Sequence, residues 1–223
     1  MTLVQSLTQY CIENLTQTND WYTWKINEKN IPVKIDLPKG NHYQKNLTLK
    51  YELNKAWKTE ADKIKKGEII KYYIEGWGGI KSNSDDKMKD YMYSSPEYLL
   101  DYGGNGIASW SKALVIHNPD KYAIFDARVS ISLNCLQIVY KVGTKKLFPN
   151  IGSRNKKVKE GQKLIKDYSN KNRWEKVNKT TFYLEYLSLL KEVTVTTNTN
   201  LSTIEMLLFS KAEELVNKIK NLA

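Results

Sequence analysis

Four stretches of the chain repeat apolar residues three and four positions apart, which is the spacing of an amphipathic helix. They are residues 1–15, 51–66, 180–191 and 202–219. In the last stretch Ser202 and Glu205 form a capping-box pattern, so one long helix is expected to close the chain. The polar residues 194–200 are expected to form a connector before it. The pattern predicts a predominantly α-helical protein.

Proline and glycine divide the rest of the chain. Residues 31–40 contain two prolines and a glycine and are expected to form an irregular connector, with a short hairpin as the alternative. Ser95 and Pro96 mark a helix start, and the glycines of Gly103–Gly106 then permit a tight turn. A further helix follows until Pro119 ends it. The sequence therefore predicts a helix, a glycine hairpin, a helix and a loop.

The segment that follows this loop fits two structures. It reads YAIFDARVSISLN over residues 122–134. Val129 and Leu133 recur on one helical face, but Val129, Ile131 and Leu133 also alternate as in a strand. Periodicity alone leaves both structures open, and only a helix beginning near Asp126 would place this carboxylate at a helix N-terminus.

Composition narrows the class of protein. The chain has 223 residues, 41% of them hydrophobic, which is enough for a folded core. It contains neither an apolar run long enough to span a membrane nor the pattern of a secretory signal, so a cytoplasmic protein is expected. Two cysteines and two histidines argue against a disulfide framework and a metal site. No cofactor is expected, and catalysis would have to use carboxylate, Lys, Tyr or Ser side chains.

Charge is concentrated in one region of the chain. Residues 141–179 contain 13 Lys and Arg and three acidic residues, a balance of +10 in a chain whose net charge is +11. Such a region favours a polyanionic partner, most simply nucleic acid. A solvated, lysine-rich surface without a partner is the alternative, and charge alone does not decide between them.

The order of these elements resembles the helix-hairpin-helix DNA glycosylase superfamily. In that superfamily a glycine hairpin and a helix precede a loop and an essential Asp, as GGNG at 103–106 precedes Asp126 here. The resemblance covers residues 95–140 and is strongest to the archaeal type of 8-oxoguanine glycosylase, whose catalytic Lys and Asp-x-Arg-Val sequence Lys112 and Asp126–Val129 would match. The hairpin lacks the usual preceding Leu-Pro, and the interval from Lys112 to Asp126 is short for that type.

The resemblance implies an all-α fold, with residues 1–223 forming one glycosylase-like unit of two helical lobes around a cleft. It implies a monomeric enzyme that flips and excises a damaged or modified base from double-stranded DNA, in repair or in defence against phage. Asp126 would stabilise the positive charge that develops on the sugar, and Lys112 would be a nucleophile that adds AP-lyase activity. The expected DNA contacts are Gly103, Gly104, Asn105, Gly106, Arg128, Lys156 and Lys157, and the expected base pocket is Trp77, Trp110 and Tyr122.

Structural roles are the alternative for each of these residues. Asp126 could simply cap a helix, Lys112 could be a solvated surface residue, and the tryptophans could belong to the core. The second interpretation of the whole chain is therefore a non-enzymatic helix-hairpin-helix DNA-binding protein, which binds DNA without releasing a base.

Overall fold

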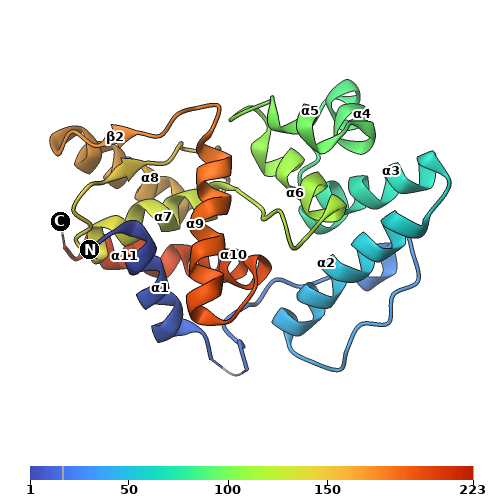
Figure 1. The fold of residues 1–223 in the computed structure, drawn as a ribbon, viewed down its shortest axis with the longest axis horizontal. Coiled ribbons are helices and arrows are strands. Elements are labelled where there is room, and N and C mark those ends of the chain that lie inside the picture. Colours follow the sequence, from blue (N-terminus) through green and yellow to red (C-terminus); the bar gives the residue numbers. More distant parts are fainter. Residues whose placement is uncertain (17, 223) are drawn as a thin grey trace. The chain divides into compact units, whose positions relative to one another are not determined.

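The computed structural model describes residues 1–16 and 18–222, and its regular secondary structure is almost entirely helical (Figure 1). The expected all-α class is confirmed. The chain divides into two compact units, one formed by Met1–Gln17 together with Phe125–Ala223 and the other by Thr18–Ile124. In the described part of the chain no helix is long and apolar enough to cross a bilayer.

The unit formed by the two chain ends, called unit 1, is built around α7 (Ala127–Val139). This helix packs against four others, and nearly all of its residues are buried. The remaining elements of unit 1 are α1 (Leu3–Asn14), β1 (Lys146–Leu147), α8 (Lys156–Lys171), β2 (Glu175–Lys176), α9 (Phe182–Thr197), α10 (Leu201–Ser210) and α11 (Ala212–Lys220). The two short strands pair in parallel, with Lys146 opposite Glu175.

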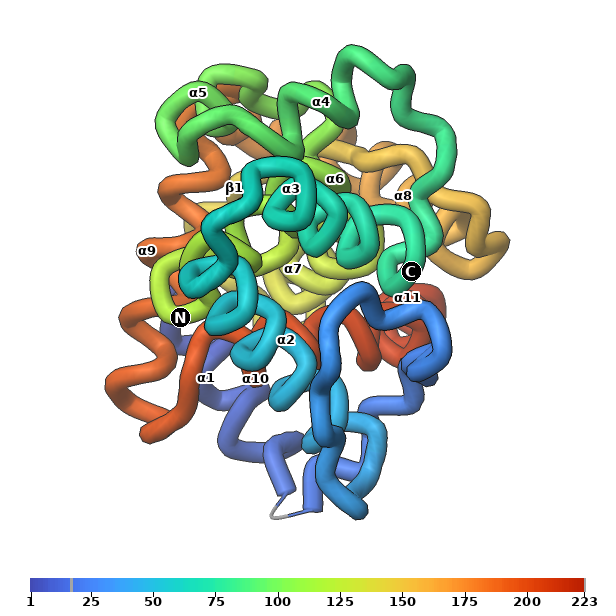
Figure 2. Tube along the Cα trace, turned by 90° about the vertical axis from the view of Figure 1, so that its right-hand side faces the viewer, coloured from blue at the N-terminus to red at the C-terminus, as the bar shows by residue number. Residues whose placement is uncertain are grey.

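The unit formed by Thr18–Ile124, called unit 2, is built around α6 (Ile107–His117). This helix packs against the four α-helices of unit 2 that Figure 2 labels around it, and against the π-helix η2 (Tyr72–Trp77). The elements of unit 2 besides α6 are η1 (Glu28–Asn30), α2 (His42–Thr59), α3 (Lys63–Lys71), η2 (Tyr72–Trp77), α4 (Asp85–Tyr93) and α5 (Pro96–Leu100). Residues 31–40 contain neither helix nor strand, as the sequence predicts.

The predicted series of helix, hairpin, helix, loop and helix is confirmed over residues 95–140. The ambiguous stretch is a helix from Ala127 onward. Its alternation of polar and apolar residues resembled a strand because the polar residues of this helix are buried as well. The Ser132 hydroxyl donates to the Leu208 carbonyl over 2.6 Å, and Asn134 exchanges two hydrogen bonds with the backbone of Phe148. A helix that is buried all round shows no clear amphipathic period.

Three predictions near the C-terminus are wrong. The long closing helix is in fact α10 and α11, which are separated at Lys211, and the N-cap is Asn200 rather than Ser202. The Asn200 side chain accepts from Thr203 N over 2.9 Å, whereas the Ser202 hydroxyl is buried without a partner among the described residues. Helix α9 continues to Thr197, so most of the predicted connector is helical.

The predicted helix over 51–66 is also wrong in its extent. Helix α2 begins earlier, at His42, and ends at Thr59. Asp62 then caps α3 by accepting from Ile64 N and Lys65 N. Ile64, which the spacing placed on the buried face, is 67% exposed because it lies in the first turn of a new helix.

Candidate functional site

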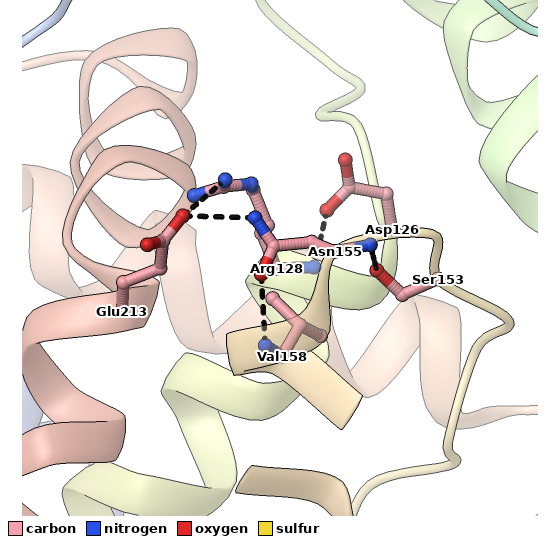
Figure 3. A network of polar contacts seen from close by, with 6 residues as sticks. All are labelled: Asp126, Arg128, Ser153, Asn155, Val158 and Glu213. Carbon is pink, nitrogen blue, oxygen red and sulfur yellow. Dashed lines mark hydrogen bonds and ion pairs between the residues drawn. The ribbon is translucent and has the colours of Figure 1, made fainter. Parts of the chain in front are cut away.

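Asp126 is the N-cap of α7. One carboxylate oxygen, Oδ1, accepts from Arg128 N over 2.9 Å and from Val129 N over 3.0 Å. The second oxygen receives no hydrogen bond from a described residue, and Figure 3 shows it pointing away from the helix. The side chain is half-buried. One oxygen is therefore occupied by capping, while the other is left to interact with a substrate or water.

An aromatic cluster holds the residue before Asp126. The buried ring of Phe125 lies 5.2 Å from that of Phe182, 5.1 Å from that of Tyr186 and 6.3 Å from that of Phe148, measured between centroids. Burial raises the pKa of Tyr186 well above its ordinary value, and the nearby carboxylates of Glu205 and Asp126 raise it further. Tyr186 is therefore neutral at physiological pH. The N-cap Asp126 directly follows a residue that is held in a buried aromatic cluster.

Arg128 connects α7 to α11, as Figure 3 shows, and also contacts α10. Its guanidinium donates to Glu213 Oε1 over 2.6 Å and lies 5.2 Å from the centroid of the Phe209 ring. The same Glu213 oxygen accepts from Asn155 Nδ2 over 2.9 Å, and Asn155 in turn caps α8 by accepting from Val158 N. These bonds hold the pKa of the Glu213 carboxyl below its ordinary value, chiefly through Arg128. The network fixes the N-terminus of α8 beside that of α7.

The two lysines predicted to contact DNA lie in the first turn of α8 and differ in their surroundings. Lys156 is exposed and forms no salt bridge with a described residue. Lys157 is half-buried, and its ammonium lies 2.9 Å from Glu160, which also binds Lys220. Of the two, Lys156 has its charge available to a partner molecule.

The glycine hairpin in unit 2 is confirmed as a turn between α5 and α6. Gly103 and Gly106 have φ of 54° and 66°, and a Cβ at Gly106 would lie 2.2 Å from the Tyr91 hydroxyl. Gly104, Asn105 and Gly106 are exposed, and the N–H groups of Gly104 and Gly106 donate to no described residue. These groups are available to an anion such as phosphate.

Lys112 is buried, with 4% of its surface exposed, so the alternative of a solvated lysine is wrong. Its ammonium donates to the Ala108 carbonyl over 2.6 Å. The stem lies against Gly78, where a Cβ would be 2.7 Å from Lys112 Cε. Helix α6 is buried on nearly all sides, which is why the helical spacing misplaced this residue.

The three aromatic residues predicted to form a base pocket are all buried. Trp110 has no exposed surface, and its indole N–H donates to the Asn105 carbonyl, which supports the hairpin. Trp77 stacks on Tyr73 at 4.4 Å and donates to Asn46 Oδ1 over 2.7 Å. Tyr122 is 3% exposed. In this structure these contacts are those of core residues, and the base-pocket role stays a prediction.

Sequence reasoning missed several residues around these positions. Glu213, Asn155 and Gly78 are far along the chain from the residues they contact, so no local pattern could have found them. Trp24, which is 36% exposed and lies in WYTWK, could have been noticed as an aromatic residue between polar ones. Its ring lies 6.1 Å from that of Trp77.

Two surface hollows lie apart from Asp126 and Lys112. A hollow of about 390 Å³ in unit 1 is lined by residues of α7, α8 and α11, and one of about 280 Å³ in unit 2 by residues around η2. Neither includes Asp126 or Lys112. Within the described residues no three His, Cys, Asp or Glu side chains are grouped to hold a metal ion. No family model, curated protein or solved structure matches the chain.

Proposed function

We propose that the protein is a DNA glycosylase that excises a damaged or modified base by cleaving the N-glycosidic bond. The observation that carries the proposal is the carboxylate of Asp126, which caps α7 with one oxygen and leaves the other without a protein partner among the described residues. It follows a helix, a glycine hairpin and a second helix in chain order, as in the glycosylases that the sequence resembles.

The chemistry of base release fits a carboxylate in this position. As the base departs, positive charge develops on the sugar, and an ionised carboxylate beside it stabilises the transition state. The carboxylate of Asp126 accepts from two backbone N–H groups at the N-terminus of α7, where the positive end of the helix dipole lies. The free oxygen of Asp126 could also orient or deprotonate an attacking water. The exposed N–H groups of the hairpin would bind a phosphate and position the strand without reading its sequence.

The buried amine of Lys112 supports a second route within the same function. If this amine attacks the sugar carbon, the base leaves and a Schiff base forms, from which strand cleavage can follow. An amine must be uncharged to act as a nucleophile, so the ammonium of Lys112 would have to lose a proton before the attack. The hydrogen bond to Ala108 would have to break for the amine to attack.

Asp126→Asn tests the central role. Asn is as good an N-cap as Asp, so α7 should stay intact while the charge is lost. We expect base release from duplexes that carry a panel of modified bases to fall at least about 100-fold, with duplex binding unchanged or tighter. Asp62→Asn is the matched control, because Asp62 caps α3 by accepting from the backbone N–H groups two and three residues after it, as Asp126 does in α7. Turnover by Asp126→Asn within a few-fold of the unchanged protein would remove Asp126 from the mechanism.

Lys112→Gln separates the two routes. If Lys112 is the nucleophile, borohydride should trap the unchanged protein on DNA and the variant should give no trapped complex. The exposed Lys121→Gln is the control, and thermal unfolding checks that the buried substitution leaves the fold intact. Full excision by Lys112→Gln, with no trapped complex in the unchanged protein, would assign the nucleophile to water.

A non-enzymatic DNA-binding protein is the second candidate, and the capping hydrogen bonds of Asp126 favour it, since they give the residue a structural role. Binding to every duplex without release of any base, including bases from genomic and phage DNA, would support this candidate.

A further inference from the structure

Helix α8 carries four lysines along one exposed face. They are Lys156, Lys159, Lys163 and Lys166, and we call them the lysine stripe. We propose that the lysine stripe is a surface that contacts the phosphates of double-stranded DNA. Its part in base excision rests on the proposed function, but its binding of DNA is measurable without any excision.

The spacing of the lysines makes the stripe continuous. Steps of three, four and three residues keep the side chains on one side of a helix, and ten residues span about 15 Å. This length corresponds to roughly four phosphates along one strand of a duplex. The opposite side of α8 is buried, and Gly161 lets it approach closely, since a Cβ there would lie 2.4 Å from Val216. The stripe is therefore held on a rigid helix.

The charges of the stripe are not neutralised within the protein. None of its four lysines forms a salt bridge with a described residue, whereas the adjacent Lys157 is paired with Glu160. The one other acidic residue of the helix, Asp167, is exposed and lies four residues after Lys163, and it forms no salt bridge with a described residue. Four unpaired positive charges in a row favour a partner with regularly spaced negative charges.

A lipid surface fits the stripe less well than DNA. A helix that lies on a membrane needs apolar side chains exposed beside its basic ones. The apolar side of α8 is buried against α7 and α11 instead. Single-stranded nucleic acid is likewise disfavoured, because its bases stack on exposed aromatic side chains. The large hydrophobic residues exposed in the described part of unit 1 include no aromatic ring.

Within unit 1, the N-terminal end of the stripe is linked to the residues that follow Asp126. Asn155, the N-cap of α8, is joined through Glu213 to Arg128, two residues after Asp126 (Figure 3). A duplex that contacts Lys156, the first residue after Asn155, would therefore lie near the N-terminus of α7, where Asp126 is.

The test measures binding of a labelled, undamaged duplex of about 20 base pairs by fluorescence anisotropy, at several salt concentrations from about 50 to 200 mM. The variant replaces the four lysines of the stripe by Gln, which keeps helix propensity. We expect affinity to fall. The slope of log affinity against log salt should become shallower by about 0.9 for each phosphate that the variant no longer neutralises, or about 3 to 4 in total.

A matched control removes the same charge elsewhere. Four exposed lysines of unit 2, none in a salt bridge with a described residue, are replaced by Gln: Lys29, Lys58, Lys65 and Lys87. We expect this control to change the salt slope by less than about one. Both variants should melt at the temperature of the unchanged protein.

Three outcomes would overturn the proposal. An unchanged slope in the stripe variant would show that these lysines are a solvated surface. Equal changes in both variants would show that only net charge matters. Stripe-dependent binding of anionic vesicles or single strands that is tighter than binding of the duplex would identify a different partner. Absence of base release would leave the proposal standing and would count against the glycosylase function alone.

Discussion

At Gly78 the backbone approaches Lys112 so closely that no side chain fits. A Cβ there would lie 2.7 Å from the Ile74 carbonyl oxygen and 2.7 Å from Lys112 Cε, although φ at Gly78 is an ordinary −81°. The constraint is therefore contact rather than backbone conformation. The stem of the buried Lys112 has room beside the end of η2 because the C-cap residue there, Gly78, has no side chain.

Gly78→Ala should destabilise the protein by about 1 to 3 kcal/mol, since the Ile74 carbonyl belongs to the backbone and cannot easily move. Urea unfolding measures this, with Gly152→Ala as control, because a Cβ at Gly152 meets nothing within 4 Å. If Lys112 is the nucleophile, folded Gly78→Ala protein should also give less borohydride-trapped complex. A cost no larger than that of Gly152→Ala would show that the Lys112 stem moves aside freely.

At the scale of elements, α7 and α11 pack against each other, and an ion pair between Arg128 and Glu213 is added to this packing. Arg128 and Glu213 are 25% and 45% exposed, so solvent weakens their attraction, and the pair is worth at most about 1 kcal/mol. The pKa of Glu213 is lowered from its ordinary value of 4.5. The stability that the ion pair contributes is therefore present above pH 4.5 and is lost as the pH falls below it.

Arg128→Met and Glu213→Gln should each lower the free energy of unfolding by roughly 0.5 to 1 kcal/mol, and Arg128→Met should cost more because it also removes the cation–π interaction with Phe209. Together they should cost less than the sum of the two. Lys89 and Asp86, which are 69% and 95% exposed and 3.9 Å apart, are a control pair whose coupling should be near zero. Strict additivity for Arg128 and Glu213 would mean that the bond contributes nothing.

The sequence predicted the elements where local patterns determine them. The conformational effects of proline and glycine are local, so Pro96, the hairpin glycines and Pro119 predict the order of helices and turns before Asp126. The N-cap role of Asp126 is also a local feature and could be predicted as an alternative. Burial of Lys112 depends on Gly78, 34 residues earlier, and Arg128 meets Glu213 85 residues later. Contacts of this kind come from packing between elements, which a single sequence does not display.

At the scale of the molecule, the two units should differ in their response to acid. His117 in unit 2 packs on Trp57 with 4.3 Å between ring centroids, and its Nε2 is buried without a partner among the described residues. Burial lowers the pKa of His117 to about 4, while Glu97 opposes this shift and Lys66 adds to it. The unfolded chain takes up a proton near pH 6.5, so stability falls as the pH drops from there to about 4.

This loss should amount to about 1 to 3 kcal/mol between pH 7 and pH 4.5, measured by urea unfolding. Tryptophan fluorescence reports mainly on unit 2, which contains five of the six tryptophans: Trp21, Trp24, Trp57, Trp77 and Trp110. His117→Gln should flatten the pH dependence, and replacement of the other histidine, His42→Gln, should leave it unchanged. Parallel curves for all three proteins would assign the acid sensitivity to other groups.

Unit 1 is made of two segments separated by the whole of unit 2, and this has a consequence for biosynthesis. Helix α1 packs against α7, α9 and α10, which the ribosome makes much later. At roughly 5 to 20 residues per second, the partners in α9 follow α1 by about 10 to 40 s. Unit 2 is continuous and can fold during that time. During this time the apolar side of α1, which includes Leu7 and Tyr10, stays exposed to solvent on the nascent chain. We expect a chaperone to bind it there.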